Sequence, residues 1–451
     1  MTIKCALAKL IPMSSPIPPK QAIEEIVHWI KTYYDDRKGG LPRSVKQDGS
    51  TSKYRLFNDL GDYLPFMAYL GEKKFCDRHL QDVKNILTKD HLLPPDFKYF
   101  GLPCTRSYEH TDLLLGLIDA YTFFPSEDLK ALLSTVSQGV IQAFHPDGKN
   151  PSSWYFPTIK YHLPILDYKD GMFIEIWTLL AEAIDEPRYL KKAEDLASKL
   201  IKAVPKPFAP LVPDVVGMNP IGHLVTHTYL NKHRLHYTPM KYLSNTAYAI
   251  LEIYKATRKD IYLNLLKEIK TALQTYALDE NHRIVEFDRN GTKAIQSKTA
   301  HLVQNFPIMD WAADCFYFTK DESFLTFAKQ IADAWLPLQE AQTGLIPFST
   351  KSQETDLDTL TDTSMAFMKI GELSGDQKYS EAGKRIINGI LTYHRKPELK
   401  GYVLMVNAKT GEVTCNDLKI KFICLFLKAI IVLDEQKPIY GTSLYELTKD
   451  R

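Results

Sequence analysis

The chain has 451 residues, of which 45% are hydrophobic and 24% charged, and its 56 Lys and Arg residues almost balance 54 Asp and Glu residues. This average composition excludes a collagen-like or low-complexity chain and a small domain held by disulfides. The formal net charge of +2 argues against a nucleic-acid-binding protein, which normally carries a clustered basic face. We therefore expect a folded globular protein with no nucleic-acid partner.

The sequence gives no sign of a membrane span, a secretion signal or a metal site. Its longest apolar stretch, residues 422–433, is interrupted by Lys428 and is shorter than the about 20 residues that a transmembrane helix needs. Lys4 and Lys9 interrupt the only apolar stretch near the N-terminus, where a signal peptide would need an unbroken one. The six cysteines show no Cys-x-x-Cys spacing. We therefore expect a cytoplasmic protein with reduced thiols, no membrane partner, no metal and no cofactor.

A degenerate repeat of helical hairpins runs along the chain. A turn with an acidic residue or Gly, then an aromatic residue or Leu, then an amphipathic run recurs, as in DEPRYLKKA (185–193) and KDESFLTFA (320–328). A largely apolar helix precedes each turn, and the helix after it has apolar residues at i, i+3, i+4 and i+7. Residues 170–184 and 189–203 are examples of the two kinds. The apolar helices are predicted to be buried around a closed centre and the amphipathic helices to lie outside.

The lengths of the loops distinguish the two ends of these hairpins. Long segments rich in Gly, Pro, aromatic residues and His precede nearly every inner helix, whereas only a few residues follow it. This asymmetry predicts an all-α fold, an α/α toroid (barrel) of six to seven helical hairpins, with inner helices around a central cavity and long loops at one mouth. Counted as seven, the hairpins run from helix 20–36 with helix 59–70 to helix 377–394 with helix 417–434.

Strand signals are weak, and no linker divides the chain. Only residues 283–287 and 402–406 alternate as strands do, and we expect them to form hairpin edges within the loops. No Gly-, Pro- or Ser-rich linker separates two parts. We therefore expect one α/α-toroid domain over residues 1–451, with 1–19 as an N-terminal extension.

Candidate functional residues lie in the long loops and in the first turns of the inner helices, where function concentrates on such a scaffold. Asp, Asn and Ser at helix starts are also the ordinary capping residues, so position alone does not separate the two roles. Aromatic and His side chains in the same loops could stack on and grip sugar rings, or could pack the loops together. The residues of both kinds include Asn58, Asp59, Asp62, Glu109, His110, Asp112, Trp154, Tyr155, His162, Asp167, Asp170, Ser244, Asn245, Asp358, Asp362, Asn416 and Asp417.

Two segments resemble helix starts of a known family. Residues 107–116 (SYEHTDLLLG) and 167–173 (DYKDGMF) resemble the starts of two consecutive inner helices in unsaturated uronyl and rhamnogalacturonyl hydrolases of the six-hairpin glycosidase superfamily. The pattern TGLIPFS (343–349), followed by 362–379, is similar to the closing repeats of such enzymes. In the family each of the first two segments supplies a key aspartate. The resemblance therefore implies Asp112 and Asp170 as catalytic residues.

The resemblance also implies a reaction. Glycoside hydrolysis needs one carboxyl group that donates a proton and another that activates water or stabilises an oxocarbenium-like centre. In the family variant, Asp170 would protonate the double bond of an unsaturated terminal sugar and activate water, with Asp112 as its electrostatic partner. We expect a glycoside hydrolase that acts on oligosaccharides, including those with uronic acid or unsaturated uronyl termini. Asp59, His110, Trp154, Tyr155 and His162 are the expected substrate-binding residues.

Residues 219–237 contain four of the thirteen histidines. His223 and His227 have the i, i+4 spacing of a metal pair on a helix, but the Glu of an HExxH motif is missing. We favour a loop that lines the cavity, where His227, Arg234 and His236 would bind an acidic sugar. The same histidines support an alternative, a sugar epimerase or isomerase in which His227 or His236 moves a proton. A lyase and a non-catalytic glycan-binding helical scaffold are further alternatives.

Overall fold

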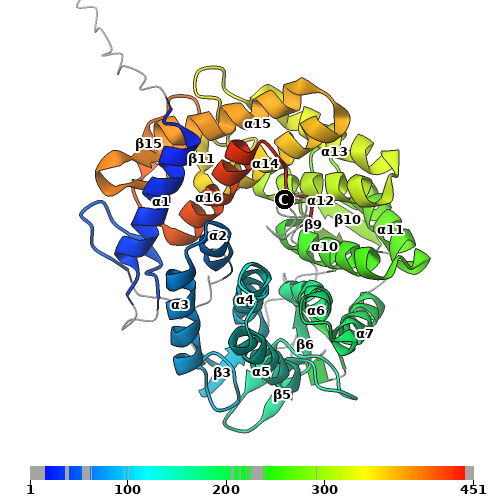
Figure 1. Ribbon diagram of the computed structural model, residues 1–451. Coiled ribbons are helices and arrows are strands. Elements are labelled where there is room, and N and C mark those ends of the chain that lie inside the picture. The colour runs from blue at the N-terminus through cyan, green and yellow to red at the C-terminus, as the bar shows by residue number, and fades with distance from the viewer. Residues whose placement is uncertain are drawn as a thin grey trace, which may run out of the picture.

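The computed structural model describes residues 16–35, 40–52, 61, 63–95, 97–99, 101–204, 208–212, 215–219, 221–222, 224, 237–238, 240–290 and 292–441. These residues form fourteen α-helices, which alternate between an inner and an outer ring (Figure 1). The all-α toroid predicted from the loop lengths is therefore confirmed. None of the described helices is long and apolar enough to cross a membrane.

Seven helices form the inner ring. Each packs against the next, and the last packs against the first, which closes the ring (Figure 1). They are α2 (Leu64–Tyr69), α4 (Thr111–Phe123), α6 (Gly171–Ala183), α10 (Met240–Thr257), α12 (Leu302–Thr319), α14 (Leu357–Ser374) and α16 (Ile420–Glu435).

Seven helices form the outer ring. They are α1 (Pro19–Tyr33), α3 (Lys73–Ile86), α5 (Glu127–Phe144), α7 (Pro187–Ala203), α11 (Asp260–Tyr276), α13 (Glu322–Trp335) and α15 (Gln377–Gly389). Six of them pack on the inner helix that precedes them, and α1 packs on α16. The sequence had paired helix 20–36 with helix 59–70. In the structure α1 packs on α16 instead, so the first and the last helix of the described chain form the hairpin that closes the ring.

The recurring turn motif ends one helix and starts the next. After α14, Gly375 adopts a φ of 68°, and Asp376 then accepts a hydrogen bond from the Lys378 amide at 3.2 Å. After α12, Lys320 has the same left-handed conformation and Asp321 accepts from the Ser323 amide at 3.0 Å. A left-handed residue satisfies the helix C-terminus, and an acidic N-cap satisfies the next N-terminus. The acidic residue or Gly that recurs in the sequence therefore marks this short turn between two helices.

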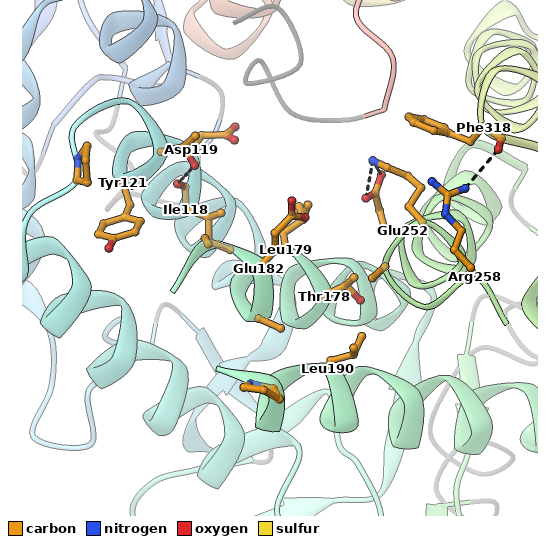
Figure 2. Close-up of a pocket in the computed structure, with 17 residues that line it drawn as sticks. Ile118, Asp119, Tyr121, Thr178, Leu179, Glu182, Leu190, Glu252, Arg258 and Phe318 are labelled. Carbon is orange, nitrogen blue, oxygen red and sulfur yellow. Dashed lines mark hydrogen bonds and ion pairs between the residues drawn. The ribbon is translucent and has the colours of Figure 1, made fainter. Parts of the chain in front are cut away.

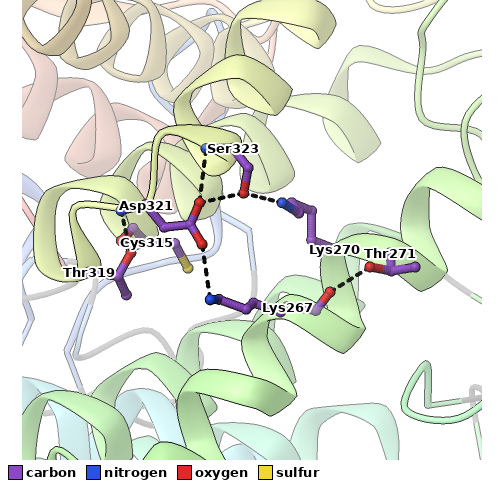
Figure 3. A network of polar contacts seen from close by, with 7 residues as sticks. All are labelled: Lys267, Lys270, Thr271, Cys315, Thr319, Asp321 and Ser323. Carbon is purple, nitrogen blue, oxygen red and sulfur yellow. Dashed lines mark hydrogen bonds and ion pairs between the residues drawn. The ribbon is translucent and has the colours of Figure 1, made fainter.

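Neighbouring outer helices are also joined by polar contacts (Figure 3). The Lys267 ammonium of α11 lies 3.2 Å from Asp321, and Lys270 donates a hydrogen bond to Ser323. Asp321 thus serves both as the cap of α13 and as the partner of α11.

Short strands occupy the long loops before the inner helices. One sheet has the order β2-β3-β4-β5, and others have the orders β10-β9-β8, β11-β14-β15, β6-β7, β1-β16 and β12-β13. The strands are β1 (Ser44–Val45), β2 (Phe97–Tyr99), β3 (Leu102–Arg106), β4 (Trp154–Phe156), β5 (Tyr161–Leu163), β6 (Ile165–Asp167), β7 (Val215–Gly217), β8 (Tyr237–Thr238), β9 (Phe287–Asn290), β10 (Lys293–Gln296), β11 (Glu354–Asp356), β12 (Arg395–Lys396), β13 (Gly401–Tyr402), β14 (Met405–Asn407), β15 (Val413–Cys415) and β16 (Leu418–Lys419). The strand expected at 283–287 starts only at Phe287, and the one at 402–406 is divided between β13 and β14.

Candidate active site

Acidic side chains line the interior of the ring at seven-residue spacing. Asp112 and Asp119 share a face of α4, and Glu175 and Glu182 share a face of α6, because seven residues are almost two helical turns. Asp119 and Glu182 line a cavity, so these faces are turned toward the ring interior. The inner helices surround a closed centre as predicted, but these carboxylates interrupt their apolar surface. One carboxylate every second turn leaves such a helix mostly apolar.

Asp112 lies at the start of α4, at the long-loop mouth. Its carboxylate is 3.7 Å from the ammonium of Lys421, and the two side chains are 22% and 39% exposed. Lys421 belongs to α16, which is separated from α4 in the ring by α2. The pair therefore joins two inner helices that are not neighbours, and its carboxylate is accessible from solvent.

Glu175 is a second carboxylate at this end of the ring, and the sequence analysis did not select it. It is 4% exposed and lies in α6 between Ile174 and Ile176, both fully buried. Burying a carboxylate is costly unless other groups compensate it. The sequence feature that could have identified Glu175 is its position as the single charged residue in the apolar run GMFIEIW (171–177).

Two cations gather at the starts of α4 and α6. The short 3-10 helices η3 (Ser107–Glu109) and η4 (Tyr168–Asp170) lie against each other there. The Tyr108 ring has the Arg106 guanidinium 4.3 Å and the Lys169 ammonium 4.6 Å from its centroid. Arg106 also donates from Nε and Nη2 to the buried Glu109 carboxylate, at 2.9 and 2.6 Å. A cluster of two cations and one carboxylate around the Tyr108 ring therefore precedes both helices.

Asp170, expected as the proton donor, is 0% exposed in the structure. The Ser107 hydroxyl donates to its Oδ1 at 2.8 Å, and the Ser153 hydroxyl donates to its Oδ2. These serines belong to the loops before α4 and α6. Asp170 thus ties both loops to the start of α6 and is not brought to the surface of the cavity.

His110, expected to bind substrate, is fully buried. Its Nε2 accepts a hydrogen bond from the Leu93 amide at 3.0 Å, which leaves Nδ1–H to donate to the Arg106 carbonyl at 3.2 Å. Burial lowers the pKa of His110 to about 4. This histidine is therefore neutral at pH 7, with both ring nitrogens engaged by backbone.

The expected aromatic platform also packs inside the loops. Trp154 is buried in a small apolar cluster with neighbours that include Phe156 and Leu163. Tyr155 stacks on His162 with ring centroids 5.1 Å apart, and the His162 ring bonds the Ala143 carbonyl at 2.6 Å. The sequence allowed two roles for these side chains, sugar binding and packing of the loops. In the structure they pack the loops together.

The remaining expected binding residues, Asp59, His227, Arg234 and His236, lie outside the described residues, as does His223. Within the described ranges, no group of three or more His, Cys, Asp or Glu side chains is arranged to hold a metal ion.

A buried ionic network joins three inner helices deeper in the ring. Lys369 of α14 lies 2.7 Å from Asp310 and 2.9 Å from Asp314 of α12, and Tyr248 of α10 donates to Asp310. Burial raises the pKa of Asp314 to about 7, although Lys369 acts against this shift. Burial alone would lower the pKa of Lys369, but the two carboxylates raise it. Tyr440, near the end of the described chain, stacks on Tyr317 of α12 with centroids 3.8 Å apart.

The cavity itself lies at the opposite mouth, where the short turns are. It has a volume of about 910 Å³ and is lined mainly by the last turns of α4, α6 and α10. Figure 2 shows Asp119, Glu182 and Glu252 around this hollow, with Arg258 at its α10 side. The ring interior therefore carries ionisable groups at both ends.

No family model matches the sequence, and no curated protein matches it. Solved structures do match. An α-1,2-mannosidase from Trichoderma reesei superposes with a TM-score of 0.68 at 14% identity, covering 93% of this chain and 94% of that chain. A sugar epimerase from a ruminal bacterium gives 0.60 at 11% identity, covering 93% and 100%. An unsaturated glucuronyl hydrolase specific for heparin gives 0.53 at 12% identity, covering 94% and 98%.

These neighbours are carbohydrate-active enzymes, both hydrolases and epimerases. They are similar to this chain over almost its whole length. At identities of 14% or less the similarity concerns the fold. The chain has the α/α-toroid fold that these neighbours share.

Proposed function

We propose that the chain is a glycoside hydrolase that cleaves oligosaccharides inside the ring, at the long-loop mouth. The observation that carries this proposal is a pair of carboxylates on neighbouring inner helices, Asp112 of α4 and Glu175 of α6, on faces turned toward the interior. Glycoside hydrolysis requires two such groups, one to protonate the leaving oxygen and one to activate water or stabilise the cationic centre.

The two carboxylates have different surroundings, which suits different roles. Asp112 is accessible and ion-paired with Lys421, so it is the group that faces the sugar as a carboxylate. Glu175 is only 4% exposed, and burial favours the protonated form of a carboxyl group, so we assign it as the proton donor. A pair of carboxyl groups in contrasting environments is a recurring basis for acid/base catalysis.

Asp170 has a positioning role in this proposal. Both of its oxygens accept serine hydroxyls, so it holds the loops before α4 and α6 in place. Because η3 leads directly into α4, movement of these loops would move Asp112. Asp170 therefore acts on the reaction through the loops that carry the site.

The cations at this mouth support a substrate with an acidic sugar. Arg106 and Lys169 flank the face of Tyr108, and Lys421 lies beside Asp112. Ammonium groups such as those of Lys169 and Lys421 bind carboxylates, whereas the Arg106 guanidinium is already bonded to Glu109 and helps to fix Tyr108 in place. An oligosaccharide that contains a uronic acid fits this arrangement better than a neutral one.

The test is a product analysis on a panel of neutral, uronic-acid-terminated and unsaturated uronyl oligosaccharides. We expect the wild type to release sugars from acidic members of the panel. Asp112→Asn and Glu175→Gln should each slow release by about 100-fold or more. The matched control is Glu268→Gln, an exposed residue of the outer helix α11, which should behave as the wild type.

Two outcomes would contradict the proposal. One is release that both variants retain at the wild-type rate. The other is no release with any substrate while solvent deuterium enters a carbon of the intact sugar, which would support the epimerase or isomerase alternative instead.

A further inference from the structure

The last described residues pack on the inside of the ring. After α16, Gln436 adopts a left-handed conformation with a φ of 53°, and the chain then turns from the ring wall toward the ring centre (Figure 1). Ile439 and Tyr440 are 5% and 7% exposed. We call residues 436–441 the C-terminal strap. Its burial makes it a packed part of the fold.

The C-terminal strap contacts inner helices other than α16. The Tyr440 ring stacks on Tyr317 of α12 with centroids 3.8 Å apart, and its hydroxyl donates to Glu372 of α14 at 2.9 Å. These contacts fix the direction in which the chain runs after α16. It crosses the short-turn mouth toward α10.

The strap ends at the edge of the cavity in that mouth. The backbone N–H of Gly441 donates to the Asp314 carboxyl group of α12. A Cβ atom at Gly441 would lie 3.1 Å from Lys255 Nζ and 3.5 Å from Glu252 Oε1, and both of these α10 residues line the cavity. The chain therefore continues from Gly441 at the α10 side of the cavity.

The cavity has an apolar wall that the described residues cover only in part. Leu179 of α6, Leu190 of α7 and Phe318 of α12 line it, and each of these side chains is neither buried nor fully exposed. Removal of such apolar surface from water is favourable. The cavity volume of about 910 Å³ leaves room for several side chains. An occupant with apolar side chains would therefore be stabilised here.

The chain itself supplies such an occupant. Residues 442–451 (TSLYELTKDR) follow Gly441, lie outside the described residues and include Leu444, Tyr445 and Leu447. At about 3.3 to 3.6 Å per residue, these three are within roughly 10 to 20 Å of Gly441 even in an extended chain. A short tether also gives a segment an effective concentration in the millimolar range at a neighbouring site. Weak apolar contacts are therefore sufficient to hold it in the cavity.

We propose that the cavity at the short-turn mouth is the docking site of this chain's own C-terminal segment, residues 442–451. Leu444, Tyr445 and Leu447 cover its apolar wall. The docked segment extends the C-terminal strap across the short-turn mouth and closes it, so that a substrate enters the ring through the long-loop mouth. The substrate route rests on the proposed function, whereas the docking does not.

The experiment places a photo-crosslinker in the C-terminal segment of the full chain. Tyr445→p-benzoylphenylalanine keeps an aromatic side chain and, on irradiation, bonds to a group that it contacts. We expect an intramolecular crosslink to the wall formed by Leu179, Leu190 and Phe318, located by mass spectrometry of peptides. The matched control is Ile295→p-benzoylphenylalanine. Ile295 is 53% exposed in a loop at the other mouth, so this control should give no crosslink to the wall.

Variants of the segment separate docking from chance contact. Leu444→Ser combined with Leu447→Ser removes two apolar side chains and leaves the ring itself unchanged. This change should lower the crosslink yield several-fold. In the chain without the photo-crosslinker it should speed hydrogen exchange in the last turns of α6 and α10 by about ten-fold.

Three results would overturn the proposal. The first is a crosslink that forms elsewhere on the chain or between two molecules, and the second is no crosslink at all. The third is a pair of serine changes that alters neither the yield nor the exchange rate. None of these readouts depends on activity, so failure of the docking is distinct from failure of the proposed hydrolase function.

Discussion

The carboxylate of Asp112 and the ammonium of Lys421 lie 3.7 Å apart, although α2 separates their helices in the ring. The described part of α2 spans only Leu64–Tyr69, so it is much shorter than its two neighbours. The pair therefore connects the N-terminal ends of α4 and α16 across the long-loop mouth. It places a positive charge beside the carboxylate proposed to face the sugar.

This relationship predicts the effect of Lys421→Met. An ion pair as exposed as this one contributes at most about 1 kcal/mol to stability, so the melting temperature should change little. The KM for acidic oligosaccharides should rise by about ten-fold, because a cation that binds the substrate is lost. Steady-state kinetics on acidic and neutral substrates would measure this. An equal effect on both substrates would contradict a role for Lys421 in binding acidic sugars.

Asp170 offers a test between a positioning and a catalytic role. If it holds the loops, Ser107→Ala, Ser153→Ala and Asp170→Ala should each lower the free energy of unfolding by about 1 to 3 kcal/mol. The effects of the serine and aspartate changes should not add in a double-mutant cycle, because they share one network. Urea denaturation measures these values.

The sequence-based assignment of Asp170 as proton donor predicts a different pattern. Asp170→Asn would then leave stability unchanged and remove kcat, with KM unaffected. That result would restore the role that the family resemblance implies and would contradict the positioning role.

Lys369 should be essential to the stability of the ring. Lys369→Met would leave Asp310 and Asp314 without their shared cation, and loss of one partner of a buried pair costs about 3 to 5 kcal/mol. The matched control is Lys378→Met, since Lys378 pairs with Asp333 at 2.9 Å on the surface and should cost no more than about 1 kcal/mol. Denaturation of both variants compares the two sites, and equal losses would show that the network is not buried in solution.

Four buried histidines predict a loss of stability in acid. Burial lowers the pKa of His79 and His145 to about 3 and that of His110 and His394 to about 4. In the unfolded chain a histidine has a pKa of about 6.5, so that state binds more protons between pH ~4 and pH ~6.5. Stability should therefore fall as the pH is lowered through this window. Asp314 has the opposite effect, because its raised pKa makes the native state bind one more proton than the unfolded state. Four histidines and one aspartate together leave the unfolded state with about three more bound protons than the native state in this window.

His145→Phe isolates one contribution to this pH dependence. His145 packs edge-on against Phe173, and its ring nitrogens have no hydrogen-bond partner among the described residues. The variant should fold, and the slope of stability against pH should fall by about 1.4 kcal/mol per pH unit between pH ~4 and pH ~6.5. Urea denaturation at several pH values measures the slope. An unchanged slope would show that His145 is already protonated in the native state or reachable by solvent.

The architecture was largely predictable from the sequence, because it depends on local signals. Short turns such as those at Asp321 and Asp376 mark helix ends through capping, and long loops mark the opposite mouth. Ring closure was not predictable in the same way. The packing of α1 on α16 joins segments that start 401 residues apart, at Pro19 and Ile420, and no local sequence pattern indicates such a contact.

The site was less predictable than the fold. His110 and Tyr155 stand in a loop sequence that suits sugar binding, yet tertiary packing buries both of them. Glu175 was overlooked because it lies inside an apolar helix, where periodicity indicates a core. The face of α6 that is turned toward the ring interior is determined by its packing against the neighbouring helices, which the sequence of α6 alone does not show.

The most direct test of the central claim uses Glu175→Gln with two substrates that share a sugar and differ in leaving group. A proton donor matters for the poor leaving group of an oligosaccharide and much less for a dinitrophenyl glycoside, which leaves without protonation. We predict that Glu175→Gln slows cleavage of the oligosaccharide by about 100-fold or more and leaves cleavage of the dinitrophenyl glycoside within about ten-fold of the wild type. Equal loss on both substrates, in a variant that remains folded, would contradict the assignment of Glu175 as the acid.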